Sequence, residues 1–504
     1  MLEDRSEDFK TNFLGTHFFN PPRYLELLEI IPTPHTNPKL VEFLMEFGDR
    51  YLGKTTVLCK DTPAFIANRV GVGGILSLFH LVEKRGLSIE AIDKLTGPII
   101  GRPKSATFRT CDVVGLDTLV HVANGLYENC KNDEARSSFK LPSYVEKLFE
   151  NKWLGDKTKQ GFYKKTKDEK GKKVILSLDL KSFEYKTPER VKYASLAQAK
   201  EIEDLRKRIK FLYHSKDEAG EFYREMFSDI FSYVSHRIPE ISDETYRIDQ
   251  AMKAGFGWEL GPFEIWDAIG AQAAYETAIE LGRDIAPWVK EMLDQGTSSF
   301  YQVEVDSMNY FDKEEKQYKA LPNQEALIDL YVRKKANTIW KSDVASLIDL
   351  GDDVVNLEFH SKMNAVGGDT LQAIQHAIDL TEENYKGLVI ANQGQNFSVG
   401  ANLAMIFMMA IEQDYDELDF AVRAFQQTTQ KIRYSNIPVV AAPHAMTLGG
   451  GCEIAMHADI TQAAAETYMG LVEMGVGLIP GGGGTKEMAL RSSALFNQGD
   501  IQNP

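Results

Sequence analysis

Two glycine-containing segments in the C-terminal third of the sequence could hold a reacting carbonyl group. Residues 400–402 (GAN) and 449–453 (GGGCE) each follow an apolar, strand-like run and precede a stretch of helical character. Glycine lets the backbone approach a ligand closely, and the first residues of a helix carry N–H groups without an intrahelical partner. Two such turns could direct two N–H groups at one oxygen atom and form an oxyanion hole. On residue types alone, both segments could equally be tight turns without a chemical role.

Two glutamates accompany these segments. Glu453 is the last residue of GGGCE, and Glu473 follows twenty residues later, shortly before the run 477–485 (GLIPGGGGT). Paired carboxyl groups can divide the roles of general acid and general base when their surroundings separate their pKa values. Because glutamates are also common on protein surfaces, the spacing alone leaves a structural explanation open.

A histidine and a glutamate near the N-terminus form a second candidate pair. His17 precedes FFNP (18–21), and Glu29 lies twelve residues later in the apolar run LLEII (27–31). A carboxylate on one ring nitrogen fixes the tautomer of a histidine and stabilises its imidazolium form, which leaves the other nitrogen as a base. A single histidine on a strand is, however, more often structural.

The elements that would position this pair are predicted within the first 62 residues. Residues 11–31 contain two apolar segments around an NPP turn, which predicts strand, loop and strand. Residues 37–52 carry apolar positions at helical spacing, and residues 55–59 form a short β-branched strand. This order is typical of the end of an α/β sheet, and long helical patterns follow a boundary near residue 62.

A helical unit is duplicated beyond that boundary. Residues 92–115 are echoed by residues 248–270, which begin 156 residues later. Between the copies, residues 166–190 predict an exposed connector and residues 196–227 a charged helix. The predicted domains are the end of a dinucleotide-binding domain, a first and a second helical repeat, a linker, and a final strand-and-helix domain: residues 1–62, 63–190, 191–300, 301–341 and 342–504.

Neither of two common nucleotide-binding patterns occurs in its required context. Residues 48–55 (GDRYLGKT) fit the phosphate-loop pattern, but a phosphate loop follows a strand and opens a helix, whereas here a helix precedes and a strand follows. We therefore reject nucleotide hydrolysis. A GxGxxG turn, the signature of a dinucleotide-binding fold, is found nowhere in the sequence.

The C-terminal motifs resemble the crotonase (enoyl-CoA hydratase/isomerase) superfamily over residues 342–491. The resemblance implies that Ala401 and Gly450 donate backbone N–H groups to a thioester oxygen and that Glu453 and Glu473 activate and deliver water. Asn402 stands where the family usually has Asp, which affects the edge of the pocket and not the backbone donor. The apolar run 403–411 predicts a core helix, although its family position implies that it borders the acyl pocket.

The N-terminal motifs resemble the 3-hydroxyacyl-CoA dehydrogenases over residues 11–300. The resemblance implies that His17 takes the substrate hydroxyl proton, that Glu29 orients His17, and that Asn68 contacts substrate. NAD is the implied cofactor, and a CoA thioester the implied substrate. Ala64 and Lys159 stand where the family usually has glycine, at positions that concern the fold.

Together the two resemblances imply an α/β multidomain enzyme of fatty-acid β-oxidation. The expected architecture is the tail of a Rossmann-type sheet, a duplicated all-α dehydrogenase domain, and a partial crotonase domain of ββα-spiral type. On this interpretation the sequence is a fragment, shortened at both ends, whose dehydrogenase activity should be absent and whose hydratase activity should be weak or absent. The alternatives are an enoyl-CoA isomerase and a non-catalytic protein that binds CoA thioesters.

Composition restricts the partners. At 504 residues the chain is long enough for about three domains of ~150 residues, and a formal charge of −16 disfavours nucleic acid and anionic membranes. The longest uncharged apolar run, residues 403–411, is far shorter than the ~18–20 residues needed to cross a bilayer. Four scattered cysteines predict buried, reduced thiols and no metal site. We expect a cytoplasmic homo-oligomer that acts on acyl-CoA substrates.

Overall fold

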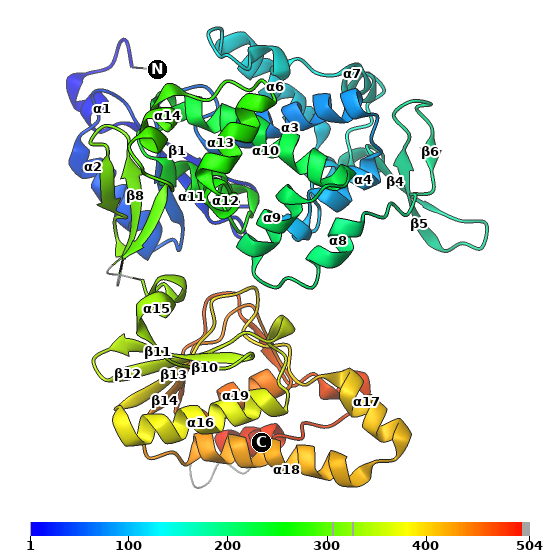
Figure 1. The fold of residues 1–504 in the computed structure, drawn as a ribbon, viewed down its shortest axis with the longest axis vertical. Helices are drawn as coiled ribbons and strands as arrows, with labels where there is room; N and C mark the ends of the chain where they lie inside the picture. The colour runs from blue at the N-terminus through cyan, green and yellow to red at the C-terminus, as the bar shows by residue number, and fades with distance from the viewer. Residues whose placement is uncertain (1, 305–306, 325–326, 496–504) are drawn as a thin grey trace. The chain divides into compact units, whose positions relative to one another are not determined.

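The computed structural model describes residues 2–304, 307–324 and 327–495, which form two compact units. The first unit contains the residues up to 302 together with 309–320, and the second contains 303–308 and the residues from 321 onward (Figure 1). The three domains predicted within residues 1–300 therefore share one unit and one hydrophobic core. The predicted linker 301–341 instead carries a three-stranded sheet, a helix and a further strand: β7 (Tyr301–Glu304), β8 (Ser307–Asp312), β9 (Gln317–Ala320), α15 (Leu330–Asn337) and β10 (Thr338–Lys341).

The first unit begins with the predicted strand, loop, strand, helix and strand. Its elements are α1 (Glu7–Thr11), β1 (Leu14–Phe18), β2 (Leu27–Pro32), α2 (Pro38–Arg50) and β3 (Thr55–Leu58). β2 is the central strand of a three-stranded sheet, antiparallel to β1 and parallel to β3. The helix α2 precedes residues 51–54 and β3 follows them, so the order that argued against a phosphate loop is confirmed.

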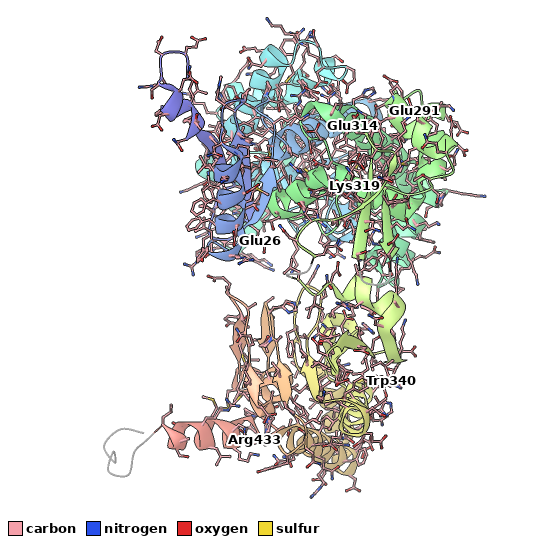
Figure 2. All side chains as sticks on the ribbon, turned by 90° about the vertical axis from the view of Figure 1, so that its left-hand side faces the viewer. Glu26, Glu291, Glu314, Lys319, Trp340 and Arg433 are labelled. Atoms are coloured by element: carbon pink, nitrogen blue, oxygen red, sulfur yellow. The ribbon has the colours of Figure 1, made fainter. Side chains whose placement is uncertain are left out.

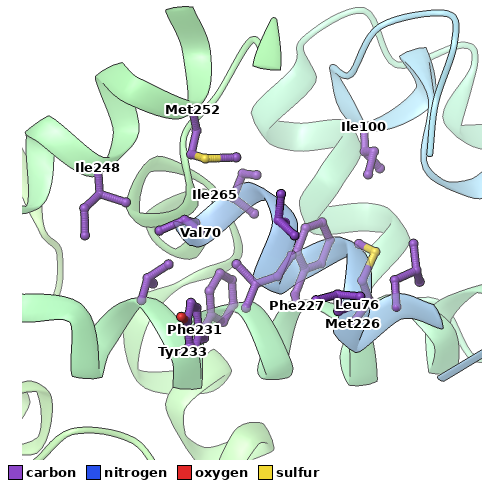
Figure 3. Packing of buried hydrophobic residues seen from close by; sticks show 14 of the residues in the cluster. Val70, Leu76, Ile100, Met226, Phe227, Phe231, Tyr233, Ile248, Met252 and Ile265 are labelled. Carbon is purple, nitrogen blue, oxygen red and sulfur yellow. The ribbon is translucent and has the colours of Figure 1, made fainter. Parts of the chain in front are cut away.

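Helices make up most of the rest of this unit. They are α3 (Ala67–Arg85), α4 (Ile89–Leu95), α5 (Phe108–Val114), α6 (Leu116–Asn129), α7 (Ser143–Glu150), α8 (Ala194–Ala199), α9 (Leu205–His214), α10 (Glu218–Glu240), α11 (Thr245–Phe256), α12 (Pro262–Ile269), α13 (Ala271–Glu280) and α14 (Pro287–Asp294). Figure 3 shows how the two predicted repeats pack, with Val70 and Leu76 of α3 beside Phe227 and Phe231 of α10. Neither repeat buries its apolar face alone, which explains why they form a single core.

The duplication is visible in matching hydrogen bonds. Asp112 of α5 accepts the N–H groups of Phe162 and Tyr163 at 2.9 and 2.8 Å. Its counterpart Asp267 of α12 accepts those of Phe300 and Tyr301, both at 2.8 Å. The Tyr163 and Tyr301 hydroxyl groups in turn donate to Asp93 and Asp249, each at 2.7 Å. The repeat found in the sequence therefore preserves the same hydrogen-bonded carboxyl groups in both copies.

We expect Asp112→Asn and Asp267→Asn each to lower the free energy of unfolding by about 1–3 kcal/mol. An amide can accept one of the two backbone N–H groups, but its own NH₂ group would face the other. Denaturant unfolding followed by circular dichroism measures the change, with the exposed Asp294→Asn as the control. A loss at one position without a comparable loss at the other would argue against equivalent roles in the two copies.

Two local predictions for the region between the repeats are wrong. Residues 166–190 form much of a small antiparallel sheet, β4 (Tyr163–Lys167), β5 (Lys173–Leu178) and β6 (Tyr185–Lys186), rather than a plain connector. The single charged helix predicted for residues 196–227 is divided among α8, α9 and α10. The side chains of Asp204 and Asp217 cap the starts of α9 and α10, so these two residues interrupt the helical pattern.

The second unit is built on a six-stranded sheet in the order β10-β11-β12-β13-β14-β16. Its further elements are β11 (Ala345–Gly351), β12 (Val354–Phe359), α16 (Gly368–Asn384), β13 (Gly387–Ile390), α17 (Leu403–Glu412), α18 (Tyr415–Arg433), β14 (Val439–Ala441), β15 (Met446–Leu448), α19 (Gly450–His457), β16 (Ile460–Thr461), β17 (Tyr468–Gly470) and α20 (Gly484–Ala494). α16 packs on the sheet and α18 packs on α16 (Figure 1). Trp340 of β10, labelled in Figure 2, has its ring 4.8 Å from that of His376 on α16.

Other sequence predictions concern particular residues. Cys59, Cys111, Cys130 and Cys452 are buried and free, as predicted. Ala64 and Lys159 have φ angles of +63° and +62°, which explains why glycine suits these positions. Within the described part of the chain, no helix has the length and apolar character needed to cross a membrane.

Candidate active sites

His17 and Glu29 face each other across two strands. They are register partners in the antiparallel pair β1–β2, so their side chains lie on the same face of the sheet. His17 Nδ1 lies 2.6 Å from Glu29 Oε2. The glutamate side chain is fully buried, whereas the histidine side chain is 32% exposed. One ring nitrogen is thus held by the carboxylate while the ring itself stays accessible.

Backbone amides complete the support of Glu29. Its Oε1 atom accepts the N–H groups of Ile66 at 3.0 Å and Ala67 at 2.9 Å, where α3 begins. The N–H groups at a helix start have no partner within the helix, so these two supply the hydrogen bonds that the buried Glu29 Oε1 atom needs. Burial, together with the nearby charge of Glu29, raises the pKa of the Cys59 thiol far above its usual range. Cys59 therefore remains a thiol beside the pair.

Aromatic rings and Asn68 surround the histidine end of this site. The rings of Phe19 and Phe65 lie 5.2 and 5.5 Å from the His17 ring. Asn68 is half-buried in the first turn of α3, directly after the two amides that hold Glu29. The described residues show no hydrogen bond between the Asn68 side chain and either member of the pair, so its proposed contact with substrate remains a prediction.

The two glycine-containing turns of the second unit meet through their backbones. Gly400 and Gly449 have φ angles of +86° and +51°. A Cβ atom added at Gly400 would lie 2.7 Å from Leu448 O and 3.0 Å from Gly450 N. A Cβ atom added at Gly450 would lie 3.7 Å from Ala401 N. A side chain at Gly400 would therefore push the turns apart, which is why glycine is needed there.

Both expected oxyanion donors belong to these adjoining turns. Gly450 is the first residue of α19, so its N–H group has no acceptor within the helix. The Ala401 N–H group takes part in none of the hydrogen bonds found among the described residues. Two backbone donors without partners at one place are the arrangement that a developing oxyanion requires.

Glu453 is buried one turn into α19. Its side chain is 1% exposed, and its Oε1 atom accepts the Gly484 N–H group at 2.8 Å. Burial raises the pKa of Glu453, and the charge of Glu473 raises it further, against the opposing effect of the Gly484 N–H group. The glycine run is needed for this approach, because a Cβ atom at Gly482 would lie 2.8 Å from Glu453 Oε2.

Glu473, which follows both turns in the sequence, lies beside the turn at Gly449. It begins the short 3₁₀ helix η6 (Glu473–Val476). Its Oε1 atom lies 3.1 Å from the position of a Cβ atom on Gly449, and its buried Oε2 atom has no hydrogen-bond partner in the described part of the chain. Burial and the charges of Glu473 and Glu453 raise the pKa of Cys452 to about 11. The structure thus brings both glutamates to the turns that carry the two N–H donors.

Some parts of these sites were not predicted from the sequence. The amides of Ile66, Ala67 and Gly484 hold the two buried glutamates, yet backbone groups leave no side-chain signature. Only the glycine run 481–484 signals a close approach. The prediction of a core helix at residues 403–411 is wrong, since no residue of α17 is buried. Its apolar residues are largely exposed: Leu403, Met405, Phe407, Met408 and Ile411.

Comparisons with known proteins identify the domains. Residues 3–62 match the 3-hydroxyacyl-CoA dehydrogenase NAD-binding domain, residues 65–165 match the 3-hydroxyacyl-CoA dehydrogenase C-terminal domain, and residues 351–491 match the enoyl-CoA hydratase/isomerase family. The chain thus carries dehydrogenase domains followed by a crotonase-fold domain, and the predicted fold class and domain order are confirmed.

Individual relatives extend beyond this chain. It is 50% identical over 489 residues to a probable 3-hydroxyacyl-CoA dehydrogenase of Bacillus subtilis, which covers 97% of this chain and 61% of that protein. It is 29% identical to a putative fatty acid oxidation complex trifunctional enzyme of Rickettsia felis, over 98% of this chain and 64% of that protein. The solved structure of an enoyl-CoA hydratase from Bacillus anthracis is 26% identical, with a TM-score of 0.27 over 29% of this chain and 57% of that one. The chain spans about three-fifths of the length of the two relatives.

Proposed function

We propose that the protein carrying this chain hydrates a trans-2-enoyl-CoA to a 3-hydroxyacyl-CoA and oxidises that product with NAD to the 3-ketoacyl-CoA. These are consecutive steps of fatty-acid β-oxidation. The observation that carries the proposal is the meeting of two glutamates with two backbone N–H groups for which the described residues of the second unit offer no partner. The domain matches and the names of the relatives support the same pair of reactions.

In the hydration step, the N–H groups of Ala401 and Gly450 would hold the thioester oxygen. Negative charge develops on that oxygen as water attacks C3, so the two donors stabilise the enolate more than the substrate. One carboxyl group of the pair Glu453 and Glu473 takes a proton from the attacking water, and the other supplies a proton to C2. Water is thereby added across the double bond, and the total number of protons on the two carboxyl groups is unchanged.

In the oxidation step, the chain would supply the proton acceptor. His17 Nδ1–H donates to Glu29, which leaves Nε2 with a lone pair for the substrate hydroxyl proton. The Glu29 carboxylate then stabilises the imidazolium that forms. Asn68, in the first turn of α3, would contact substrate. NAD, when bound, accepts the hydride from C3, but the sequence has no GxGxxG turn to hold its diphosphate.

The proposal includes a cytoplasmic homo-oligomer without nucleic-acid or membrane partners. Four buried free thiols fit a reducing compartment, and the formal charge of −16 opposes binding to polyanions. The exposed apolar side chains of α17 offer surface for contact with another subunit. Sedimentation velocity of the purified protein measures the oligomeric state, and a monomer at all concentrations would contradict this part.

Enzyme assays of the purified protein that carries this chain test the activities. With trans-2-butenoyl-CoA, we expect loss of the ultraviolet absorbance of the enoyl thioester and formation of 3-hydroxybutanoyl-CoA, identified by chromatography. With 3-hydroxybutanoyl-CoA and NAD, we expect NADH to appear. A product with a shifted double bond would identify an isomerase, and binding of the enoyl-CoA without turnover would identify a non-catalytic binding protein. Either result would overturn the hydratase assignment.

A further inference from the structure

A second buried carboxyl group lies close to Glu453 in the structure and has no part in the proposed chemistry. The Glu487 side chain on α20 is fully buried, and neither carboxyl oxygen has a hydrogen-bond partner among the residues that the structure describes. Four basic groups surround it: Lys486 Nζ at 3.3 Å, His457 Nε2 at 3.6 Å, Arg433 Nη1 at 3.8 Å and Arg491 Nε at 3.9 Å. Figure 2 labels Arg433, at the end of α18. Burying a carboxyl group is costly without such partners, so these four contacts offset part of the cost.

His457 connects this carboxyl group to Glu453. The histidine is fully buried at the end of α19, and its Nδ1 atom lies 2.7 Å from the backbone oxygen of Glu453. A carbonyl oxygen can only accept, so Nδ1 must carry a proton and donate it. The Nε2 atom faces Glu487 and lies 3.6 Å from its Oε1 atom, too far for a hydrogen bond, so the two buried side chains meet as a close contact.

The helices α19 and α20 thus contact each other at two successive positions along their length, called here the first and the second level. At the first level, Gly484 N–H of α20 donates to the carboxylate of Glu453 on α19. At the second level, Glu487 of α20 faces His457 of α19. Glu453 and His457 are four residues apart, and Gly484 and Glu487 are three apart, so each level is about one helical turn from the other. A shift of α20 at the second level would move the Gly484 amide at the first.

We propose that Glu487 and His457 are a positioning pair that holds the first turn of α20 so that the Gly484 N–H group stays on the Glu453 carboxylate. The pair touches neither the thioester oxygen donors nor Glu473 among the described contacts, so its effect is through Glu453. This inference rests on the proposed hydratase function and adds to it two residues outside the acid–base pair.

The first test is the variant Glu487→Gln, which keeps the shape of the side chain and removes its charge. We expect kcat for hydration to fall about 10–100-fold with KM changed by less than about threefold, as for other groups that orient a reacting residue. The matched control is Lys486→Gln, which changes another member of the same cluster whose side chain is 43% exposed, and we expect a change of less than about twofold. Equal losses in the two variants would contradict the proposal.

A double-mutant cycle separates positioning from a general structural role. In a protein that already carries Glu453→Gln, the added change Glu487→Gln should cost no further activity, because the group that it positions is gone. Independent, additive losses would overturn the proposal. Thermal unfolding of each variant shows whether it folds. If Glu487→Gln does not fold, His457→Asn takes its place in the cycle, because the asparagine amide can still donate to the Glu453 carbonyl oxygen.

A titration without any enzyme assay keeps this inference separate from the proposed function. The protein is labelled with ¹³C at the carboxyl groups of its glutamates. The signal of Glu453 is the one that is missing from the spectrum of the Glu453→Gln variant. Because the Gly484 N–H group lowers the pKa of Glu453, we expect Glu487→Gln to move the midpoint upward by about one pH unit. The charge of Glu473 and the Gly482 N–H group also act on the pKa of Glu453. The other titratable groups of the adjoining elements are Cys452, His457, Arg433, Lys486, Glu487 and Arg491. An unchanged midpoint contradicts the positioning pair even if the protein proves to have no hydratase activity.

Discussion

The variant Glu453→Gln is expected to hydrate trans-2-enoyl-CoA at least about a hundredfold more slowly than the parent protein. A glutamine can still accept the Gly484 N–H group at the position where Oε1 now lies, so the local fold should be preserved. It cannot take up or release a proton, however, and general acid–base catalysis typically contributes a factor of about 10²–10⁴. The decrease in enoyl-thioester absorbance under saturating substrate measures kcat.

Two further variants make this result specific. Glu473→Gln should show a loss of similar size, because the proposed reaction requires both carboxyl groups. Glu383→Gln, at an exposed position on α16, is the control and should leave the rate within about twofold. If both Glu453→Gln and Glu473→Gln retained the parent rate, the mechanism with two carboxyl groups would be rejected.

The second large effect is expected at the dehydrogenase site. In Glu29→Gln, the amide NH₂ group would donate to His17 Nδ1, so the histidine would carry its proton on Nε2 and could not accept one from the substrate. An equivalent change of tautomer in the catalytic triad of a serine protease lowers kcat by about 10⁴, and we expect a loss of about 10³–10⁴ here. The measurement is the rate of NADH formation from a 3-hydroxyacyl-CoA by the purified protein carrying this chain.

The control for this variant is close by in the sequence. Glu26 lies three residues before Glu29 but is exposed (Figure 2), so Glu26→Gln should keep the parent rate. Glu29→Gln also places an amide NH₂ group in a fully buried site, and circular dichroism must show that the fold is retained. Normal NADH formation by a folded Glu29→Gln protein would exclude the role that we assign to the pair.

Local sequence patterns predict the secondary structure correctly where residues close together in the sequence determine it. The strands around His17 and Glu29 were predicted from apolar runs and an NPP turn, and the pairing of β1 with β2 then placed the two side chains opposite each other. The repeat was visible because its two copies keep the same residue types at nearly the same spacing. The prediction failed at residues 196–227, where Asp204 and Asp217 cap new helices, because a charged residue that caps a helix resembles one on its exposed face.

The sequence by itself determined the order of the domains, the two candidate acid–base pairs and the glycine-containing turns, because side-chain type and short spacing carry that information. Only the tertiary structure decided which backbone amides hold Glu29 and Glu453, how close Glu473 comes to Gly449, and that Glu487 is buried against His457. Amide groups are the same in every residue except proline, so a sequence cannot mark which of them will meet a carboxylate. That meeting depends on how separate helices and strands pack, and burial then determines how strongly each contact acts.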